Sequence, residues 1–499
     1  MYKWEVTFKD ENNNDYIYDY WNNAIYHSGE CFQNVRKLKG QYDIDTIVSL
    51  LPDFSREEVL LNYKRIQKIE ETNKLITKFK TEALEKPKKY LPRLTHKTFE
   101  KMISLTKQLT LEVCQSCNQR CEYCIYSGKY EFQRTHPEGN KVMSFDIARK
   151  SIDYFISLIN SKKRILKYGN AAIGFYGGEP LLAFELIKEC VDYIKKKETK
   201  EKIIYTITTN GTRLNEEMIN FFIQNDFWIL LSLDGPQEEH DKFRVFKNKR
   251  GTFEKTMKGI SMLKKYQDYY EKKVSISSTY CMAHDLLSIE EFFEENFKDK
   301  NILASAIRST RTDFYRKVKP DPNFLEKYKR LFRKYCDAVE NNKPLSSYIN
   351  GFFSKNLAKV HDRPMIRLDN RLNGILKIFN ICANCFPGEK IFVDTDGVFF
   401  ICERVNQFFS IGDYQNGINF KKVKKIVESY SQFALKHCLF CEARRFCNLC
   451  ISHNGVKGNF EYNDTCENAR MILRDTLGAY ITLYQRNKNA LLNNLRKVS

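Results

Sequence analysis

The sequence predicts an α/β fold: a partial (β/α)6 TIM-like barrel, preceded by a small N-terminal α+β module and followed by a cysteine-rich C-terminal domain. Three observations lead to this prediction. Strand-like and helix-like segments alternate between residues 105 and 310, which is typical of βα units around a parallel sheet. Strand patterns followed by helical ones occupy residues 1–80. Eight of the 16 cysteines fall within residues 382–466.

Composition excludes two broad classes of protein. With 499 residues and 42% hydrophobic residues, the chain can bury large cores and is not a disordered tail. Its richest apolar stretch, residues 221–233, is interrupted by Gln224, Asn225 and Asp226, so no segment is expected to span a membrane. Residues 1–7 lack the pattern of a signal peptide. We therefore expect a cytoplasmic protein whose clustered cysteines are metal ligands or catalytic groups, not disulfides.

The net charge of +20 says less about partners than its size suggests. The lysines are spread along the chain, as in Lys264-Lys265 and Lys421-Lys422, and form no dense stripe. A solvated lysine surface explains this distribution, and a nucleic-acid partner is not favoured. A positive field would nevertheless steer an acidic peptide or a nucleic acid toward the protein.

The first 80 residues are predicted to form a winged-helix-like module. Tyr2–Phe8 and Tyr16–His27 alternate as the two strands of a hairpin. Helical patterns follow at Asp43–Leu51 and, after the N-cap candidate Ser55, at Arg56–Ile76. Such a module suits docking of a peptide or a nucleic acid, and a purely structural cap is the alternative.

The central region, residues 105–310, is predicted to hold six parallel strands. These are Gln108–Val113, Ala171–Tyr176, Ile203–Thr208, Trp228–Leu233, Val274–Tyr280 and Ile302–Ile307, with helices at Phe145–Ile159, Phe184–Lys195 and Glu216–Gln224. Residues 311–380 are predicted to form a mostly helical bridge. Residues 381–480 form the cysteine-rich domain, which a helix at 467–495 would close.

Four motifs follow the first four strands in order. They are Cys117-x3-Cys121-x2-Cys124, Gly177-Gly178-Glu179-Pro180, Thr209-Asn210-Gly211 and Asp234-Gly235-Pro236. In a parallel barrel, chemistry collects in the loops at the carboxyl ends of the strands. All four motifs are therefore expected on one rim.

Three cysteines in this spacing cannot complete a four-thiolate cluster. One iron of a 4Fe–4S cluster held by Cys117, Cys121 and Cys124 would keep an open position for a substrate or cofactor. The alternative is a zinc knuckle with Cys114, three residues upstream, as its fourth ligand. That alternative leaves the Gly-Gly-Glu-Pro loop unexplained.

The first two motifs together resemble those of the radical S-adenosylmethionine (SAM) enzymes. The resemblance implies that SAM chelates the open iron and that one electron cleaves it to a 5′-deoxyadenosyl radical, which abstracts a substrate hydrogen. It also implies a set of SAM-binding residues: Tyr123 at the adenine, Gly177 and Gly178 at the methionyl end, Glu179 at the ammonium, Ser232 at the ribose, Arg244 at the carboxylate or ribose, and Asn210. For Ser232 and Arg244, a role in stabilising their loops is the alternative.

The C-terminal cysteines resemble the SPASM domain of peptide- and protein-modifying radical enzymes. The resemblance implies two auxiliary 4Fe–4S clusters, three in all. Cys382, Cys385, Cys402 and Cys450 would hold the inner one, and Cys438, Cys441, Cys447 and Cys466 the outer one. Two residues, Asn448 and Leu449, separate the last pair of the run where the family usually has three. Two zinc sites are the alternative, because spacing alone does not separate zinc from iron–sulfur ligation.

One residue bears on the type of reaction. Glu403 follows Cys402 at the position where sulfatase-maturing relatives carry an aspartate thought to act as a base. Glu403 is therefore a candidate catalytic base, or it simply pairs with Arg404. The difference disfavours formylglycine formation without excluding it.

Taken together, the resemblance implies an oxidoreductase that matures ribosomally synthesised peptides by forming thioether crosslinks from cysteine, as sactipeptide and ranthipeptide maturases do. The expected partners are a cysteine-containing precursor, whose leader adds as a strand to the N-terminal hairpin, and a flavodoxin- or ferredoxin-type electron donor. Formylglycine formation on a sulfatase and carbon–carbon crosslinking are the enzymatic alternatives. A redox or metal-binding scaffold without turnover is a further one.

Overall fold

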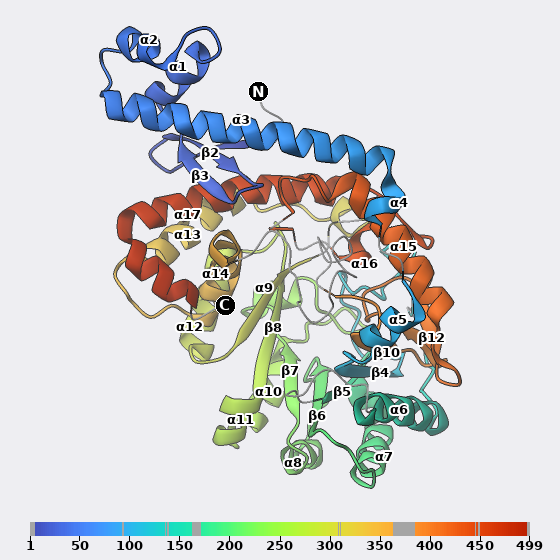
Figure 1. Cartoon of the computed structure of the whole chain (residues 1–499). Helices are drawn as coiled ribbons and strands as arrows, with labels where there is room; N and C mark the ends of the chain where they lie inside the picture. The colour runs from blue at the N-terminus through green and yellow to red at the C-terminus, as the bar shows by residue number, and fades with distance from the viewer. Residues whose placement is uncertain are drawn as a thin grey trace.

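The computed structural model describes residues 5–91, 94–134, 136, 139–161, 171–307, 309, 311–362, 385–444, 446, 447 and 450–496. One ten-stranded mixed sheet organises the chain, in the order β13-β12-β11-β10-β4-β5-β6-β7-β8-β9 (Figure 1). Helices cover its outer side, and the N-terminal segment lies across one end of the molecule. Among the described residues, no helix is both long enough and apolar enough to cross a bilayer.

The six predicted parallel strands are present and lie in sequence order. They are β4 (Gln108–Cys114), β5 (Ala171–Gly177), β6 (Ile203–Thr209), β7 (Trp228–Ser232), β8 (Val274–Tyr280) and β9 (Ile302–Ala306). Every neighbouring pair among them is parallel. The α/β part of the predicted fold, with its parallel sheet, is thus confirmed.

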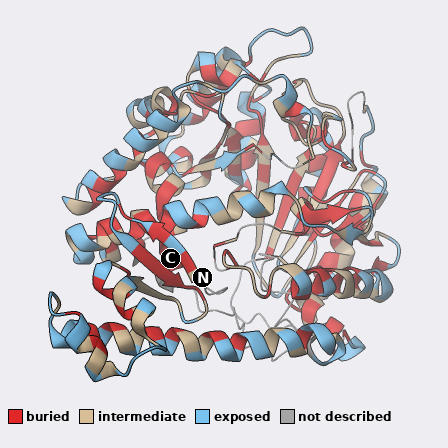
Figure 2. Cartoon of the chain, turned by 90° about the horizontal axis from the view of Figure 1, so that it is seen from above, coloured by how far each residue is buried: buried red, intermediate tan, exposed pale blue. Residues whose placement is uncertain are grey.

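Buried apolar runs explain these strands. In β5, the side chains of Ile173 and Phe175 are buried, and Figure 2 shows the strands of the sheet largely in the buried colour. Strands covered on both faces need such near-continuous apolar runs. The surrounding helices are buried only on the side that faces the sheet. They are α6 (Phe145–Asn160), η1 (Pro180–Ala183), α7 (Phe184–Lys195), α8 (Glu216–Gln224), α9 (Gln237–Asp241), α10 (Phe253–Lys264), α11 (Gln267–Lys273) and α12 (Leu286–Phe297).

The sheet does not stop at β4, which the sequence did not predict. β10 (Lys390–Val393) pairs with β4 in parallel, and β11 (Val398–Phe400), β12 (Ser410–Asp413) and β13 (Gly417–Ile418) continue the sheet antiparallel. The cysteine-rich segment is therefore joined to the barrel edge by main-chain hydrogen bonds. As a result, Cys402 and Glu403, just after β11, come to lie beside the rim.

The rest of the C-terminal half is mainly helical. Its elements are η2 (Phe314–Arg316), α13 (Phe324–Glu340), α14 (Ser347–Asp362), α15 (Phe420–His437), α16 (Ile451–Asn454), the short pair β14 (Gly455–Val456) and β15 (Asn459–Phe460), and α17 (Asp464–Arg496). The closing helix expected at residues 467–495 corresponds to α17. Of the predicted bridge, residues 311–362 are largely helical and the remainder lies outside the described residues.

The N-terminal hairpin prediction was wrong in one respect. The predicted strand Tyr16–His27 is two strands, so the segment is a three-stranded antiparallel sheet of β1 (Glu5–Lys9), β2 (Asp15–Asp19) and β3 (Ala24–His27). Asp19 causes the interruption, because its carboxylate accepts hydrogen bonds from the backbone amides of Trp21 and Asn22 and so forms a turn.

Helices follow the small sheet, as predicted, but they extend further. They are α1 (Glu30–Leu38), which was not predicted, α2 (Ile44–Leu50), α3 (Arg56–Glu85), α4 (Pro87–Tyr90) and α5 (His96–Ile103). Ser55 caps α3 by accepting from the Glu58 amide. Helix α3 continues beyond Ile76 because it also buries Ala83 against the main core. The winged-helix-like assignment and the predicted domain bounds stay predictions.

The small sheet is held against α17. A Cβ at Gly478 of α17 would lie 2.6 Å from the Lys9 carbonyl oxygen of β1, so only a glycine allows this approach. Arg486 of the same helix donates to Glu11 at 2.8 Å. The Trp21 ring stacks on Phe440 with centroids 6.2 Å apart. The N-terminal segment therefore packs directly on the cysteine-rich region.

We expect Gly478→Ala to destabilise the protein. Alanine normally stabilises a helix by about 1 kcal/mol relative to glycine, but here the added methyl must push β1 away from α17, which costs about 1–3 kcal/mol. The melting temperature should fall and proteolysis within residues 5–27 should accelerate. Asn493→Ala, at an exposed position of the same helix, is the control and should change neither. A rise in melting temperature for Gly478→Ala would contradict the packing described.

Candidate active site

One cavity of about 350 Å³ opens at the carboxyl ends of the parallel strands. The residues predicted to bind SAM all line it, as do the three clustered cysteines and Glu403. Its lining includes Cys117, Cys121, Cys124, Tyr123, Gly177, Gly178, Glu179, Asn210, Ser232, Arg244 and Glu403. Motifs spread over almost 290 residues of sequence thus meet at one place.

The loop that carries the three cysteines is fixed by the loop after β5. The amides of Gly178 and Glu179 donate to the carbonyls of Cys114 and Ser116, each at 2.8 Å. A Cβ at Gly178 would lie 2.1 Å from the Ser116 oxygen, and one at Gly177 would lie 2.3 Å from the Cys114 oxygen. The glycines were expected to make room for the methionyl end of SAM. In the structure they make room for the chain's own backbone.

The three thiols are free, and their residues are half-buried in the cavity wall. Burial raises the pKa of all three, that of Cys121 to about 12. Arg244 Nη1 lies 3.8 Å from the Cys121 sulfur and favours its thiolate. Three thiols with raised pKa values around one space are stable as thiolates only beside a strong positive charge, such as that of an iron–sulfur cluster. The donor set therefore fits the cluster that the motif implies.

Cys114 is not part of this group. It is fully buried, its sulfur donates to the Glu179 carbonyl at 3.2 Å, and it is not among the residues that line the cavity. The zinc-knuckle alternative requires Cys114 as a fourth ligand. The geometry removes that alternative.

Glu179 has a different set of partners from the one expected. Its carboxylate accepts from the Thr209 hydroxyl at 2.6 Å, the Asn210 amide at 2.8 Å and the Leu181 amide at 3.2 Å. Burial raises its pKa, and these hydrogen bonds oppose the shift. The Glu179 carboxylate thus uses most of its acceptor positions within the protein, and its bonds with Thr209 and Asn210 join the loop after β5 to the loop after β6. Its contact with a SAM ammonium stays a prediction.

Asp234, the first residue of the fourth motif, organises the other side of the cavity. Its carboxylate accepts from Arg244 Nε at 2.9 Å, from the Thr279 amide at 2.9 Å and from the Tyr123 hydroxyl. The Arg244 guanidinium also lies over the Tyr123 ring, 5.5 Å from its centroid. The sequence singled out Tyr123 and Arg244 but not the shared carboxylate. The only available signal was the position of Asp234 directly after the fourth strand.

The remaining predicted SAM residues lie in the same wall. Ser232, at the end of β7, lines the cavity. The Asn210 side chain donates to Asn118 at 3.0 Å and accepts from Thr212. Asn210 therefore braces the cysteine loop, while Ser232 is available to a bound ligand.

A second part of the cavity wall comes from the C-terminal region. Its residues are Glu403, Arg404, Ser452 and His453, and Glu403 lies beside the loop after β4, since Tyr126 and Arg134 donate to its carbonyl. Arg404 Nε lies 3.6 Å from Glu403 Oε1, and the Glu403 side chain is 31% exposed. Arg134 donates to the Glu403 carbonyl at 2.7 Å and so fixes its backbone. Glu403 thus both pairs with Arg404 and faces the cavity. The contribution of Ser452 and His453 was not predicted.

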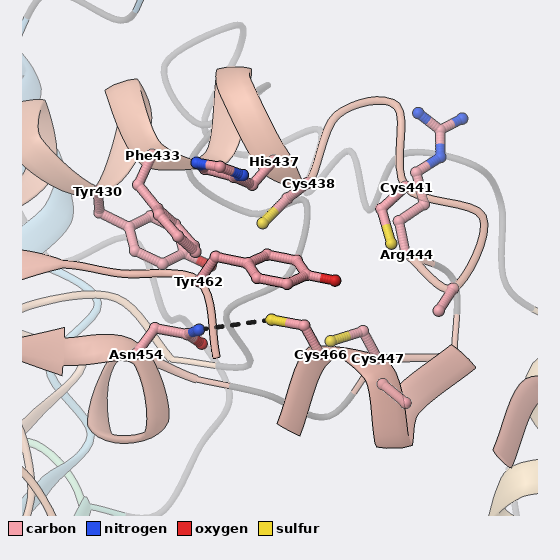
Figure 3. Close-up of a pocket in the computed structure, with 12 residues that line it drawn as sticks. Tyr430, Phe433, His437, Cys438, Cys441, Arg444, Cys447, Asn454, Tyr462 and Cys466 are labelled. Atoms are coloured by element: carbon pink, nitrogen blue, oxygen red, sulfur yellow. Dashed lines mark hydrogen bonds between the residues drawn. The ribbon is translucent and has the colours of Figure 1, made fainter. Parts of the chain in front are cut away.

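Four C-terminal cysteines surround a second, much smaller cavity of about 30 Å³ (Figure 3). They are Cys438, Cys441, Cys447 and Cys466, the set predicted for the outer auxiliary cluster. Asn454 donates to the Cys466 sulfur at 3.6 Å, and Tyr430, Phe433 and Tyr462 supply an aromatic wall. The structure therefore brings four residues from three segments to one site.

The predicted inner set is partly described. Burial raises the pKa of Cys385 and of Cys402, and Cys450 is near enough to both to add to the shift, as is Cys385 to that of Cys402. Cys382 lies outside the described residues. Burial raises the pKa of the Cys450 thiol, but hydrogen bonds with His453 at 3.3 Å and Ser452 at 3.0 Å outweigh it and lower the pKa to about 6. Cys450 is thus the most readily ionised thiol of the set.

Comparison with known proteins identifies the domain around the first site. Residues 111–284 match the model of the radical SAM superfamily. The chain is 26% identical over 361 residues to the cysteine-type anaerobic sulfatase-maturating enzyme of Clostridium novyi, covering 70% of this chain and 87% of that one. It is 23% identical to the radical SAM cyclopropyl synthase TigE of Paramaledivibacter caminithermalis, covering 77% and 75%.

A solved structure shares the fold. The structure of native anSMEcpe with bound AdoMet and Cp18Cys peptide superposes with a TM-score of 0.55 and 19% sequence identity, covering 79% of this chain and 99% of that one. At this identity the similarity concerns the fold alone.

The structure predicts a pH dependence of stability from His240, which lies under the site. His240 is fully buried, accepts from the Asp234 amide and contacts Thr252 at 3.0 Å. Burial lowers its pKa to about 3. In the unfolded chain the pKa of this histidine is near 6.5. Below that pH the unfolded chain binds a proton that the folded chain does not. The contribution of neutral His240 to the free energy of unfolding is therefore fully present above pH 6.5. It is lost at about 1.4 kcal/mol per pH unit as the pH falls toward 3.

The difference between two variants isolates this effect. Between pH 7.5 and 5.5, the free energy of unfolding measured with urea should fall by about 1 kcal/mol more in the wild type than in His240→Gln. Asn493→Ala, the exposed and non-titrating control used above, should keep the wild-type slope. Equal slopes for the wild type and His240→Gln would show that His240 is not held neutral.

Proposed function

We propose that this chain, which is an enzyme of the radical SAM superfamily, matures a ribosomally synthesised precursor peptide by forming thioether crosslinks from its cysteines. One observation carries the proposal. A single cavity has the cysteine loop and its SAM-binding candidates in one part of its wall, and Glu403, Arg404, Ser452 and His453 in another. A peptide side chain entering that space would lie between a radical source and polar groups able to manage its thiol.

The first wall is suited to hold SAM on an iron–sulfur cluster. Cys117, Cys121 and Cys124 would bind the cluster, and Tyr123, Ser232 and Arg244 would contact SAM. When bound, this pair supplies a 5′-deoxyadenosyl radical that takes one hydrogen atom from the peptide. The buried hydrogen bonds of Asp234 hold Tyr123 and Arg244 in fixed positions before SAM binds, which lowers the entropic cost of binding.

The second wall would handle the cysteine thiol. Glu403 is the carboxylate predicted to act as a base. It would accept the thiol proton, and Arg404 would keep the Glu403 carboxylate ionised beforehand. Forming the carbon–sulfur bond removes one carbon hydrogen, one thiol proton and one surplus electron. Cys402 directly precedes Glu403, and Cys450 lies two residues before Ser452. Together with Cys385 they would hold the cluster that accepts the electron.

The outer site is proposed to hold a second auxiliary cluster instead of zinc. Among the described residues, no three histidine, cysteine or acidic side chains are grouped closely enough to bind one metal ion. Zinc requires four sulfurs at about 2.3 Å from one point, whereas each thiolate of a 4Fe–4S cluster binds a different iron. Four cysteines around one cavity, spread too widely for one ion, support the cluster.

Residues 1–80 are proposed to bind the precursor's leader. The sheet β1-β2-β3 has two outer strands, β1 and β3, and an extended leader would add to one of them through main-chain hydrogen bonds. Because Tyr20 donates to the carbonyl of Phe440, between Cys438 and Cys441, the sheet is attached to the outer cysteine site. A leader bound there would reach the cavity along the C-terminal region.

Two alternatives are favoured by specific relatives. The Clostridium novyi relative is a cysteine-type sulfatase-maturating enzyme, which favours formylglycine formation on a sulfatase. TigE is a cyclopropyl synthase, which favours carbon–carbon bond formation. Glu403 at the position of the expected aspartate separates this chain from the first group.

The two groups of cysteines should have separable roles. Cys117→Ala should abolish cleavage of SAM to 5′-deoxyadenosine, because it removes one ligand of the radical-generating cluster. Cys441→Ala should leave part of that cleavage intact while abolishing peptide modification. Both are measured by chromatography and mass spectrometry after anaerobic reconstitution. Cys190→Ala, a buried cysteine on α7 away from both sites, is the control. Unchanged SAM cleavage in Cys117→Ala would overturn the proposed function.

The product identifies the reaction. After anaerobic co-expression with a cysteine-containing precursor, thioether formation should remove two hydrogens per event and leave that many cysteines resistant to alkylation under reducing conditions. Glu403→Gln should lower the yield at least tenfold while SAM cleavage continues, because the thiol proton loses its acceptor. Two lost hydrogens with every thiol free would indicate carbon–carbon coupling, and loss of the cysteine sulfur would indicate formylglycine.

A further inference from the structure

A second hollow lies on the outer side of the cysteine loop. It measures about 860 Å³ and is more open than the catalytic cavity. It is lined by Ser116, Cys117 and Asn118 of the cysteine loop, by Glu254 and Lys255 of α10, and by the segment between them, of which Phe246, Lys247, Asn248, Arg250 and Gly251 take part. Leu182, 38% exposed, contributes an apolar patch to its lining. Cys117 lines this hollow and also the catalytic cavity.

A short hairpin at residues 245–251 is attached to the cysteine loop. The Arg120 amide donates to the Val245 carbonyl at 2.7 Å, and the Glu122 amide donates to the Phe243 carbonyl at 2.9 Å. The hairpin closes on itself through the Phe246 amide and the Arg250 carbonyl. Its position relative to the cysteines is therefore set by main-chain hydrogen bonds and does not depend on surface side chains.

The rim of the hollow carries cations without ionic partners. Lys247 and Arg250 of the hairpin and Lys255 of α10 line the hollow and are exposed. Lys249 and Lys258 are exposed close to them in the sequence, and none of these five belongs to the ion pairs found among the described residues.

Two acidic side chains also line the hollow. Asp241 is engaged, since its carboxylate accepts from the amides of Thr252 and Phe253, and Glu254 is exposed. The surface is thus positively charged around an apolar patch, which is the composition of an interface for a negatively charged protein.

We propose that this basic hollow, formed by residues 116–118 and 246–255, docks a small acidic protein that carries one electron. The inference rests on the proposed function, which consumes one electron for each SAM cleaved. In the step concerned, one electron leaves the reduced carrier and enters the cluster held by Cys117, with no bond made or broken. Because Cys117 separates the hollow from the catalytic cavity, the electron enters from the outside while peptide and SAM occupy the inside.

The test uses the reconstituted holoenzyme and flavodoxin, a small acidic one-electron carrier. Binding of oxidised flavodoxin is measured by calorimetry, so this readout does not depend on turnover. The triple variant Lys247→Glu, Lys249→Glu, Arg250→Glu should weaken binding at least tenfold, and raising the salt concentration should weaken wild-type binding. SAM cleavage supported by flavodoxin should fall at least tenfold in the triple variant. Cleavage supported by dithionite, which needs no docking, should stay within twofold.

A matched charge reversal provides the control. Lys421→Glu, Lys425→Glu, Lys436→Glu changes three exposed lysines of α15 and alters the net charge equally, so it should leave flavodoxin binding within twofold. If the hairpin variant loses its fold, the charge-neutral Lys247→Gln, Lys249→Gln, Arg250→Gln replaces it, with an expected loss of at least threefold. Unchanged binding in the hairpin variants, or an equal loss in the α15 control, would overturn the docking site. Absence of SAM cleavage with dithionite in the wild type would instead contradict the proposed function.

Discussion

The site depends on how the cysteine loop is held from both sides by main-chain hydrogen bonds. On one side the amides of Gly178 and Glu179 reach the carbonyls of Cys114 and Ser116, and on the other the Arg120 amide reaches the carbonyl of Val245. A cluster with only three protein ligands requires that the loop hold all three thiols in position, because no fourth cysteine can take the place of a displaced one. The absence of a Cβ at Gly178, where it would lie 2.1 Å from the Ser116 oxygen, allows this close packing.

Buried polar groups extend the same rigidity to the rest of the cavity. Glu179 joins the loops after β5 and β6 through Thr209 and Asn210, and Asp234 joins Tyr123 to Arg244. A buried carboxylate is costly unless it is hydrogen-bonded, and each of these two is nearly saturated by partners in the protein. Both carboxylates therefore act first as parts of the scaffold. Residues with free polar atoms, such as Ser232, are left to recognise a ligand.

The two walls of the cavity come from opposite parts of the chain, and the sheet explains how they meet. β10 adds to β4 in parallel, so the turn after β11 places Glu403 beside the loop that follows β4, where Arg134 donates to its carbonyl. The N-terminal sheet packs on α17 and on Phe440, and the basic hairpin lies on the outer side of the cysteine loop. Under the proposals made above, peptide, SAM and electron carrier would approach through different surfaces, and none would block another.

The sequence by itself determined the six parallel strands and the rim on which the motifs meet. It could do so because strand patterns of five to seven residues, the first four of them followed by cysteine- or glycine-containing motifs, are local signals. It also separated the outer cysteines, Cys438, Cys441, Cys447 and Cys466, from the others through the family resemblance. Only the tertiary structure decided the partners of Glu179, the role of Asp234, the exclusion of Cys114, the presence of Ser452 and His453 in the cavity, and the basic hollow behind Cys117. Each of these depends on contacts between segments far apart in the chain, and such contacts leave no periodicity or spacing in the sequence.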